Sequence, residues 1–262
     1  MRLYQRDSAF LLRSLPPVLR ARGFYLYTEG GKRLVDLWLD AGRNILGHKP
    51  PNAVKELKNS AQRGLFSPLP HPQEKRFIKA LAKLFPRHAF RLYSDEASLL
   101  GALKDAGNAP DIPLVRPLES EGALFPVPDS PLFIPVIPCP LGPAVLVLDK
   151  TMEALFPPGD IIPPLLLALA ARGVYDLIAL APQRVKVRYR QIEKALAGPD
   201  CKWRGPGIYL YYKNPHEEWK NLWERFLEAG FLLPPDPAEP LILPGIISPG
   251  EEKKLAGLLA PN

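Results

Sequence analysis

The sequence predicts a globular protein of the α/β class. Of its 262 residues, 47% are apolar and 23% are charged, a balance that can bury one large core or two smaller ones. Both helix-like and strand-like patterns occur along the chain. Residues 144–148 form a continuous apolar run between Pro143 and Asp149, as expected of a strand that is buried on both faces of its sheet.

Three strands and three helices are expected in the first 107 residues. The expected strands lie at residues 24–27, 33–39 and 91–93, and the expected helices lie at residues 51–63, 72–85 and 94–107. Gly30 and Gly31 lie between the first two strands and predict a β-hairpin turn. The third helix is expected to begin at a cap formed by Ser94 or Asp95 and to end at Gly107.

Proline dominates the middle of the chain. Fourteen of the 33 prolines fall between Pro110 and Pro164, where their fixed φ and missing N–H discourage helices and central strands. We expect this segment to be largely loop, with residues 144–148 as its only fully buried strand. A helix is expected to follow at residues 165–180.

The last third carries clear helix-start signals. The expected strands there lie at residues 207–212 and 240–243. Asn214 is expected to cap a helix that has Pro215 at its first position. Ser248 and Glu251 have the spacing of a capping box, which predicts the start of a final helix.

The net charge of +7 and the pI of about 9.4 raise the question of nucleic-acid binding, although most basic residues are spread along the chain. The exception is a run of alternating cations, Arg184, Lys186, Arg188 and Arg190. On a strand these side chains would share one face, whereas at the start of a helix they would scatter over a solvated surface. We favour the solvated surface, because a nucleic-acid interface would need more than one such element, and nucleic-acid binding through these four cations remains the weaker alternative.

The sequence gives little support for other classes of protein. Cys139 and Cys201 lie far apart, and the four histidines share no metal-ligand spacing, so neither a disulfide framework nor a metal site is predicted. The N-terminus has no apolar signal core, and the longest apolar stretch, residues 161–171, is too short to cross a bilayer. The expectation is a cytoplasmic protein that does not act at a membrane.

Both ends of the chain resemble class III pyridoxal-phosphate aminotransferases, including their glutamate-1-semialdehyde aminomutase branch. Residues 22–27 (RGFYLY) and 31–36 (GKRLVD) are similar to the family's N-terminal hairpin with its closing aspartate. Residues 47–51 (GHKPP) resemble its Gly-His-x-x-Pro turn, and Glu96-Ala97 resembles the end of its Ser-Gly-Thr-Glu-Ala motif. Residues 226–234 (FLEAGFLLP) are similar to its closing small domain.

The resemblance implies a fold of two parts. Residues 1–90 and 200–262 would form an α+β small domain, drawn from both ends of the chain. Residues 91–199, proline-rich at 110–164, would be a reduced remnant of the α/β large domain, because this chain is far shorter than a typical member. Since the family dimerises through its large domains, the resemblance also implies a homodimer.

The family's phosphate cradle is altered in this sequence. Aligning Glu96-Ala97 on the family motif puts Tyr93 at the serine position, Ser94 at the glycine position and Asp95 at the small hydroxyl position. Glycine lets the backbone approach a phosphate closely, and a carboxylate repels it. Ser94 and Asp95 are therefore cofactor-binding candidates in a turn that looks disabled, although Ser94 could still donate to another anion.

The other two groups that pyridoxal phosphate needs are an aspartate for the ring nitrogen and a lysine for the Schiff base. Asp149 follows the buried strand, as the family's ring aspartate does, but it could equally be a solvated strand end. No lysine after Asp149 has the family's context. Lys150 is adjacent to Asp149, and Lys186 lies in the charged run, so both are weak catalytic candidates.

Two functional hypotheses follow. The first is an aminotransferase-like protein that cannot form the usual aldimine, holds no cofactor and has a binding or regulatory role, with a small anionic or amino-acid-like ligand. The alternative is an active pyridoxal-phosphate-dependent aminotransferase or aminomutase that uses a non-standard lysine, such as Lys150 or Lys186.

Overall fold

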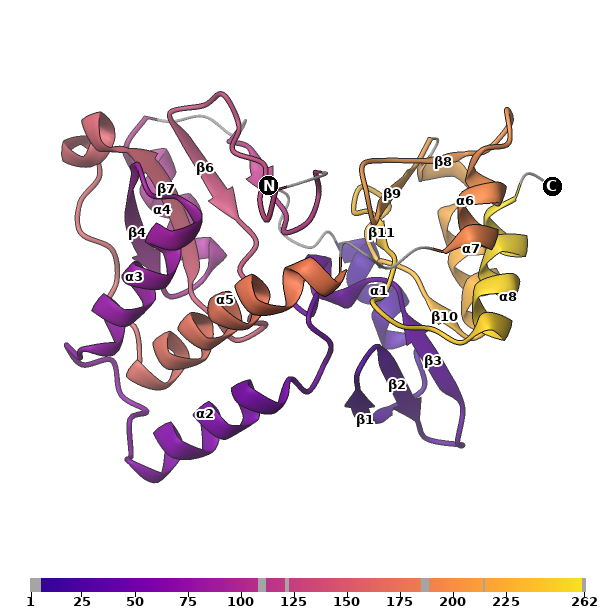
Figure 1. Ribbon diagram of the computed structural model, residues 1–262, viewed down its shortest axis with the longest axis horizontal. Coiled ribbons are helices and arrows are strands. Elements are labelled where there is room, and N and C mark those ends of the chain that lie inside the picture. Colours follow the sequence, from indigo (N-terminus) through magenta and orange to yellow (C-terminus); the bar gives the residue numbers. More distant parts are fainter. Residues whose placement is uncertain (1–5, 108–111, 121–122, 185–188, 214, 261–262) are drawn as a thin grey trace. The chain divides into compact units, whose positions relative to one another are not determined.

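A computed structural model describes residues 6–107, 112–120, 123–184, 189–213 and 215–260. The chain divides into two compact units, each described here by itself (Figure 1). The first unit spans Pro50–Ala181, and the second combines Arg2–Lys49 with Pro182–Asn262. The second unit is therefore drawn from both ends of the chain.

The boundaries between the two units lie at residues 49/50 and 181/182, whereas the resemblance implies domain boundaries at 90/91 and 199/200. Residues 50–90 belong to the first unit because they contact later segments of that unit. The ring of Phe85 contacts that of Phe133 at a centroid distance of 5.2 Å, and the Leu165 amide donates to the Leu65 carbonyl over 3.2 Å. The first contact ties Phe85 to the sheet, and the second ties the segment at Leu65 to a later helix of the same unit.

The first unit has one four-stranded sheet in the order β4-β7-β6-β5. Its strands are β4 (His88–Tyr93), β5 (Leu114–Val115), β6 (Leu132–Pro135) and β7 (Ala144–Asp149). Its helices are α2 (Pro51–Gln62), α3 (Gln73–Leu84), α4 (Glu96–Asp105), the 3₁₀ helix η2 (Lys150–Leu155) and α5 (Pro164–Arg184). β7 is antiparallel to both β4 and β6, and β5 is parallel to β6.

Both faces of this sheet are covered, which explains the continuous apolar run of β7. Leu99 of α4 packs with Leu146 and Leu148 on one face, and Phe133, opposite Val147 in the register, meets Phe85 on the other. The predicted strand at 144–148 is confirmed. It is not the only buried strand of the segment, however, because β6 is buried throughout and escaped prediction between its flanking prolines.

The second unit contains two small sheets. One has the order β1-β2-β3-β10, and the other has the order β11-β9-β8. Its strands are β1 (Val18–Arg22), β2 (Tyr25–Thr28), β3 (Arg33–Asp36), β8 (Trp203–Arg204), β9 (Tyr209–Tyr212), β10 (Phe231–Leu232) and β11 (Leu241–Ile242). Its helices are α1 (Arg6–Arg13), η1 (Leu39–Gly42), α6 (Arg190–Leu196), α7 (Pro215–Glu228) and α8 (Pro249–Leu259).

One apolar core holds the second unit together, and it joins the two ends of the chain. Trp223 and Phe226 of α7 are buried with Leu34 of β3 and Leu255 of α8. β10 pairs in parallel with β3, so a strand from residue 231 onward completes the sheet begun by the N-terminal hairpin. The sheet β1-β2-β3-β10 therefore needs residues from both ends of the chain.

Most helix and strand predictions are confirmed, with boundary shifts of a few residues. The 24–39 hairpin forms as β2 and β3, and Ser248 and Glu251 form the expected capping box of α8. Strand β1 was missed because it is mostly exposed and has no apolar alternation. The predicted Asn214 cap lies outside the described residues.

The residues that carry the N-terminal resemblance meet at one place in the second unit. The Asp36 carboxylate accepts from the Trp38 amide over 2.9 Å and lies 2.8 Å from His48 Nε2. The His48 amide donates to the Gly23 carbonyl over 2.8 Å. Gly47 has a φ of +88°, and a Cβ there would lie 3.0 Å from that carbonyl oxygen. This motif therefore fixes the turn that follows β3.

Candidate functional site

The turn between β4 and α4 is the candidate site that the sequence singles out. Asp95 Oδ1 accepts a hydrogen bond from the Ser98 amide over 2.8 Å, so Asp95, not Ser94, is the N-cap of α4. The Ser94 amide donates to Asp160 Oδ2, also over 2.8 Å. An amide that could face an external anion is thus bonded to a carboxylate of the chain itself.

Asp160 reaches the turn because its segment runs along the outer edge of β4. The Asp160 amide donates to the Leu92 carbonyl over 2.8 Å. Gly159 makes this approach possible, since a Cβ there would lie only 2.0 Å from the Leu92 oxygen. β4 is an edge strand of its sheet, and this segment covers part of that edge.

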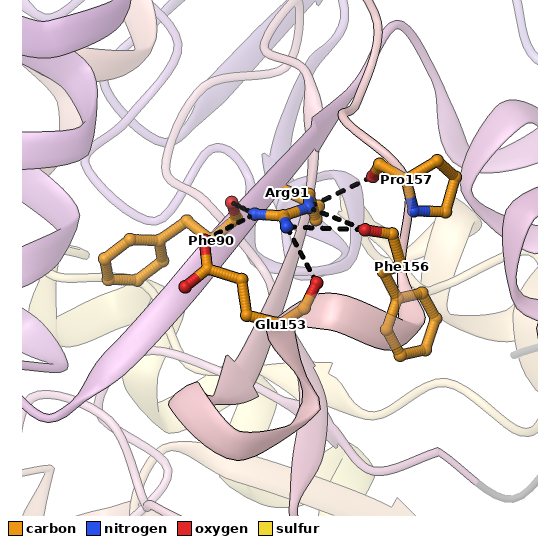
Figure 2. Close-up of polar contacts among 5 residues, drawn as sticks. All are labelled: Phe90, Arg91, Glu153, Phe156 and Pro157. Carbon is orange, nitrogen blue, oxygen red and sulfur yellow. Dashed lines mark hydrogen bonds and ion pairs between the residues drawn. The ribbon is translucent and has the colours of Figure 1, made fainter.

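Arg91 anchors the same segment (Figure 2). Its Nε donates to the Pro157 carbonyl over 3.0 Å, its Nη2 donates to the Glu153 carbonyl over 2.9 Å, and its Nη1 lies 3.1 Å from Glu153 Oε1. Nη1 also donates to the Phe90 carbonyl over 3.2 Å. Because its donors are bonded to these acceptors, the Arg91 guanidinium has a structural role and holds the segment against β4.

Tyr93, which the resemblance places at the cradle serine position, is a core residue. Its side chain is 3% exposed and packs with Leu99 and Leu148. Burial raises the pKa of the Tyr93 phenol, the charge of Arg91 opposes this rise, and the charge of Asp160 adds to it. The hydroxyl has no hydrogen-bond partner within the described residues, and it is shielded from solvent.

Asp149 lies at the opposite end of the sheet from the turn. In the antiparallel register, Asp149 pairs with His88 and Ala144 pairs with Tyr93. The two ends are five residue steps apart along the strand, about 17 Å at the usual rise per residue. The Asp149 side chain is 52% exposed, and its Oδ1 lies 3.7 Å from His88 Nε2.

The weak lysine candidates do not complete a site at the turn. Lys150 is exposed at the start of η2, directly after Asp149. Lys186 lies outside the described residues. The structure thus brings Ser94 and Asp95 together but keeps Asp149 and Lys150 at the other end of β4.

An open groove of about 720 Å³ follows the outer edge of β4 and connects these two ends. It is lined by Lys150 and His88 near one end, and by Asp160 near the other. Sequence reasoning missed Arg91, Gly159 and Asp160. The only signal for them was a glycine followed by a carboxylate after two prolines, a pattern typical of loops in general.

The described residues of the turn do not fit the phosphate of pyridoxal phosphate. The Ser94 amide already donates to a carboxylate, and the neighbouring Asp95 and Asp160 both carry negative charge. A dianion would be repelled by both. The cofactor that the resemblance implies thus lacks its cradle here.

Comparisons with known proteins agree on the fold. No family model matches the chain. An ornithine aminotransferase from Plasmodium yoelii superposes with a TM-score of 0.70, at 11% identity over 97% of this chain and 98% of that one. An acetylornithine aminotransferase from Elizabethkingia anophelis gives a TM-score of 0.66, at 13% identity over 97% and 98% of the two chains. The chain has the fold of these aminotransferases, which confirms the predicted α/β class.

Two kinds of protein are similar to this chain in sequence: uncharacterized proteins along most of its length, and an aminomutase over a short stretch. An uncharacterized protein of Treponema pallidum is 29% identical over 93% of both chains, and one of Borreliella burgdorferi is 28% identical over 92% of this chain and 89% of its own. A glutamate-1-semialdehyde 2,1-aminomutase of Aeropyrum pernix is 47% identical over 47 residues, which are 18% of this chain and 11% of that protein. The likeness to aminomutases is thus local.

Two further properties hold for the described residues. No helix there combines the length and apolar character needed to cross a membrane. No cluster of three or more histidine, cysteine, aspartate or glutamate side chains there could hold a metal ion.

Proposed function

We propose that this protein is an aminotransferase-like protein that does not form the usual pyridoxal-phosphate aldimine and has a binding or regulatory role. The observation that carries the proposal is the 2.8 Å hydrogen bond from the Ser94 amide to the Asp160 carboxylate. By the resemblance, this amide belongs to the turn that would cradle the cofactor's phosphate. A carboxylate of the chain takes the place of that anion.

Electrostatics supports the proposal. A phosphate that displaced Asp160 from the Ser94 amide would lie beside the carboxylates of Asp95 and Asp160. Two like unit charges at 4 Å repel by about 4 kcal/mol at the effective dielectric constant of a protein surface. One amide hydrogen bond to an anion, at about 1.5–3 kcal/mol, does not offset that repulsion.

The separation of the candidate residues supports it as well. An aldimine site needs the phosphate donors, the ring aspartate and the lysine around one small molecule. Asp149 is paired with the start of β4, whereas the Ser94 amide follows its end. One cofactor molecule does not span the roughly 17 Å between these two positions along the strand.

The remaining parts of the proposal concern partners and location. The role would be to bind a small anionic or amino-acid-like ligand, in a cytoplasmic homodimer, without the cofactor. We propose the homodimer because the chain resembles a dimeric family. The small domain and the reduced large domain are proposed from the same resemblance. Analytical ultracentrifugation of the purified protein would reveal the oligomeric state.

The test of the proposal is an absorbance scan of the purified protein with increasing pyridoxal phosphate, followed by borohydride reduction and mass spectrometry. We expect only scattered labelling of exposed lysines, with no stoichiometric band. Lys104→Ala, which removes an exposed lysine of α4, is the control for such labelling. A stoichiometric band with one reduced lysine adduct would contradict the proposal.

The second candidate function is an active aminotransferase or aminomutase that uses Lys150 or Lys186. One observation favours Lys150, which lines the same groove as Asp160 and His88. Under this alternative, the absorbance band and the turnover of an amino-group donor would both disappear in Lys150→Ala or Lys186→Ala and would survive in Lys104→Ala.

A further inference from the structure

The first unit carries its charge unevenly along the chain. Residues 51–87, which include α2, α3 and the loop between them, contain eight lysines and arginines against two glutamates, a net charge of +6. Residues 88–181, the rest of the unit, contain five lysines and arginines against eleven aspartates and glutamates, a net charge of −6. The unit is therefore neutral as a whole, but one helical segment of it is strongly basic.

Three exposed cations of this segment are unpaired. Lys75 and Lys79 are four residues apart on α3, so they lie on one face of the helix, about 6 Å apart along its axis. Arg63 ends α2, at the start of the loop that leads to α3. All three residues are exposed, and their side chains make no ion pair, hydrogen bond or ring contact with any described residue.

The carboxylates of the neighbouring helices are placed elsewhere. Both oxygens of Glu56 on α2 accept from Arg76 on α3, over 2.9 and 3.3 Å, and this pair ties the two helices together. Glu74 lines the groove along β4, on another side of α3. Asp176 of α5 is buried and lies 2.7 Å from Arg172. These carboxylates therefore leave the three exposed cations unneutralised.

The loop between α2 and α3 adds exposed apolar side chains. Phe66 is 61% exposed and Leu69 is 62% exposed. The preceding carbonyl, that of Leu65, accepts from the Leu165 amide, so the loop backbone is held on the unit while the Phe66 ring stays exposed. Proteins bind single-stranded nucleic acid with this combination, because cations contact the phosphates and an aromatic ring stacks on a base.

A membrane with anionic lipids would attract the same cations. A helix that binds a membrane surface, however, lays its own apolar face into the lipid. The apolar face of α3, with Phe77, Ala80 and Leu81, is buried within the unit instead. The observations therefore favour a nucleic-acid strand, which needs only cations and an aromatic ring at the surface.

We propose that the surface formed by Arg63, Phe66, Lys75 and Lys79 binds single-stranded nucleic acid, with the three cations against its phosphates and the Phe66 ring against a base. The cations come from two helices and not from a single run such as residues 184–190. The inference goes beyond the binding role proposed above, because this surface includes neither the β4–α4 turn nor the groove along β4.

Fluorescence anisotropy with a labelled oligothymidylate of about 16 nucleotides tests the proposal. We expect binding with a dissociation constant in the micromolar range at low salt. Three phosphate contacts predict a slope of about −2 for the logarithm of the affinity against the logarithm of the salt concentration. The affinity should therefore fall about twentyfold between about 50 and 200 mM salt.

A triple variant removes the cations of the surface together. It combines Arg63→Ala, Lys75→Ala and Lys79→Ala, three changes at exposed side chains that hold no other part of the fold. We expect the salt slope to approach zero and the affinity at low salt to fall at least tenfold, while circular dichroism shows an unchanged fold. Phe66→Ala should weaken binding about tenfold through loss of one base stack and should leave the salt slope unchanged.

A second triple variant is the matched control for net charge. It combines Lys104→Ala in α4 with Lys253→Ala and Lys254→Ala in α8, which also removes three exposed cations. We expect it to bind as the unchanged protein does. Absence of binding, an equal loss in both triple variants, or sedimentation with phosphatidylglycerol vesicles by a protein that does not bind the oligonucleotide would overturn the proposal. None of these outcomes bears on the pyridoxal-phosphate scan.

Discussion

Replacing Gly159 by alanine tests whether its close approach to β4 holds Asp160 at the Ser94 amide. A Cβ at Gly159 would lie 2.0 Å from the Leu92 carbonyl oxygen, whereas real Cβ atoms stay at least 3.0 Å from such neighbours. The two backbones must therefore separate by about 1 Å, which would lengthen the 2.8 Å bond from the Asp160 amide to Leu92 beyond hydrogen-bonding distance.

The expected loss of stability follows from the bonds that this displacement breaks. The bond from Asp160 to Leu92 contributes about 1 kcal/mol, and the charge-assisted bond from Ser94 to Asp160 contributes about 1.5–3 kcal/mol. Alanine restricts the unfolded chain and returns about 0.4–1 kcal/mol. The free energy of unfolding should therefore fall by about 1.5–3.5 kcal/mol, measured by urea denaturation followed by circular dichroism.

A second glycine serves as the matched control. Gly257 lies inside α8, and nothing is within 4 Å of the position of its Cβ. Gly257→Ala should raise the free energy of unfolding by about 0.5–1 kcal/mol, because alanine is the better helix former. If Gly159→Ala were as stable as the unchanged protein while Gly257→Ala behaved as expected, the segment would not hold Asp160 against β4 as described.

Three more predictions concern other parts of the fold. Burial and the hydrogen bond to Glu251 raise the pKa of Tyr25 to about 12. The stability that the protonated phenol contributes is therefore present below pH 10.0 and is lost as the pH rises through 12. In urea titrations, Tyr25→Phe should flatten this alkaline loss of stability. Ser248→Ala removes the cap of α8 and should cost about 1 kcal/mol in the same assay, and no change would refute the capping role. Burial raises the pKa of the Cys139 thiol to about 11, so Ellman's reagent should react with it only after unfolding, and prompt reaction in the native protein would contradict its burial.

Local sequence signals predicted those parts of the structure that depend on neighbouring residues. The glycine-containing turn between β2 and β3 and the capping box at Ser248 and Glu251 formed as expected, because each is satisfied within a few residues. The apolar run of β7 predicted burial on both faces correctly. Strand β6 could not be predicted in the same way. Proline lacks the N–H that strand pairing uses, and Pro135 fits in β6 because it lies at the end of the pairing with β5.

Less of the candidate site could be predicted from local sequence signals. Asp95 and Ser94 were recognised from their place in the turn, but the partner of the Ser94 amide, Asp160, lies 66 residues further along the chain. Nothing near Asp160 distinguishes it from an ordinary loop carboxylate. Its role exists only because Gly159 lets the segment approach β4 and Arg91 holds the segment at Pro157.

By itself, the sequence determined the α/β class and the approximate positions of most helices. Only the tertiary structure decided that β7 runs antiparallel to β4, which puts Asp149 beside His88 and far from Ser94. The physical reason is that an apolar run specifies burial but not direction, since the same side chains fill a core in either orientation. Direction is set by the whole chain's path between the strands, and here that path places Asp149 and Ser94 at opposite ends of β4.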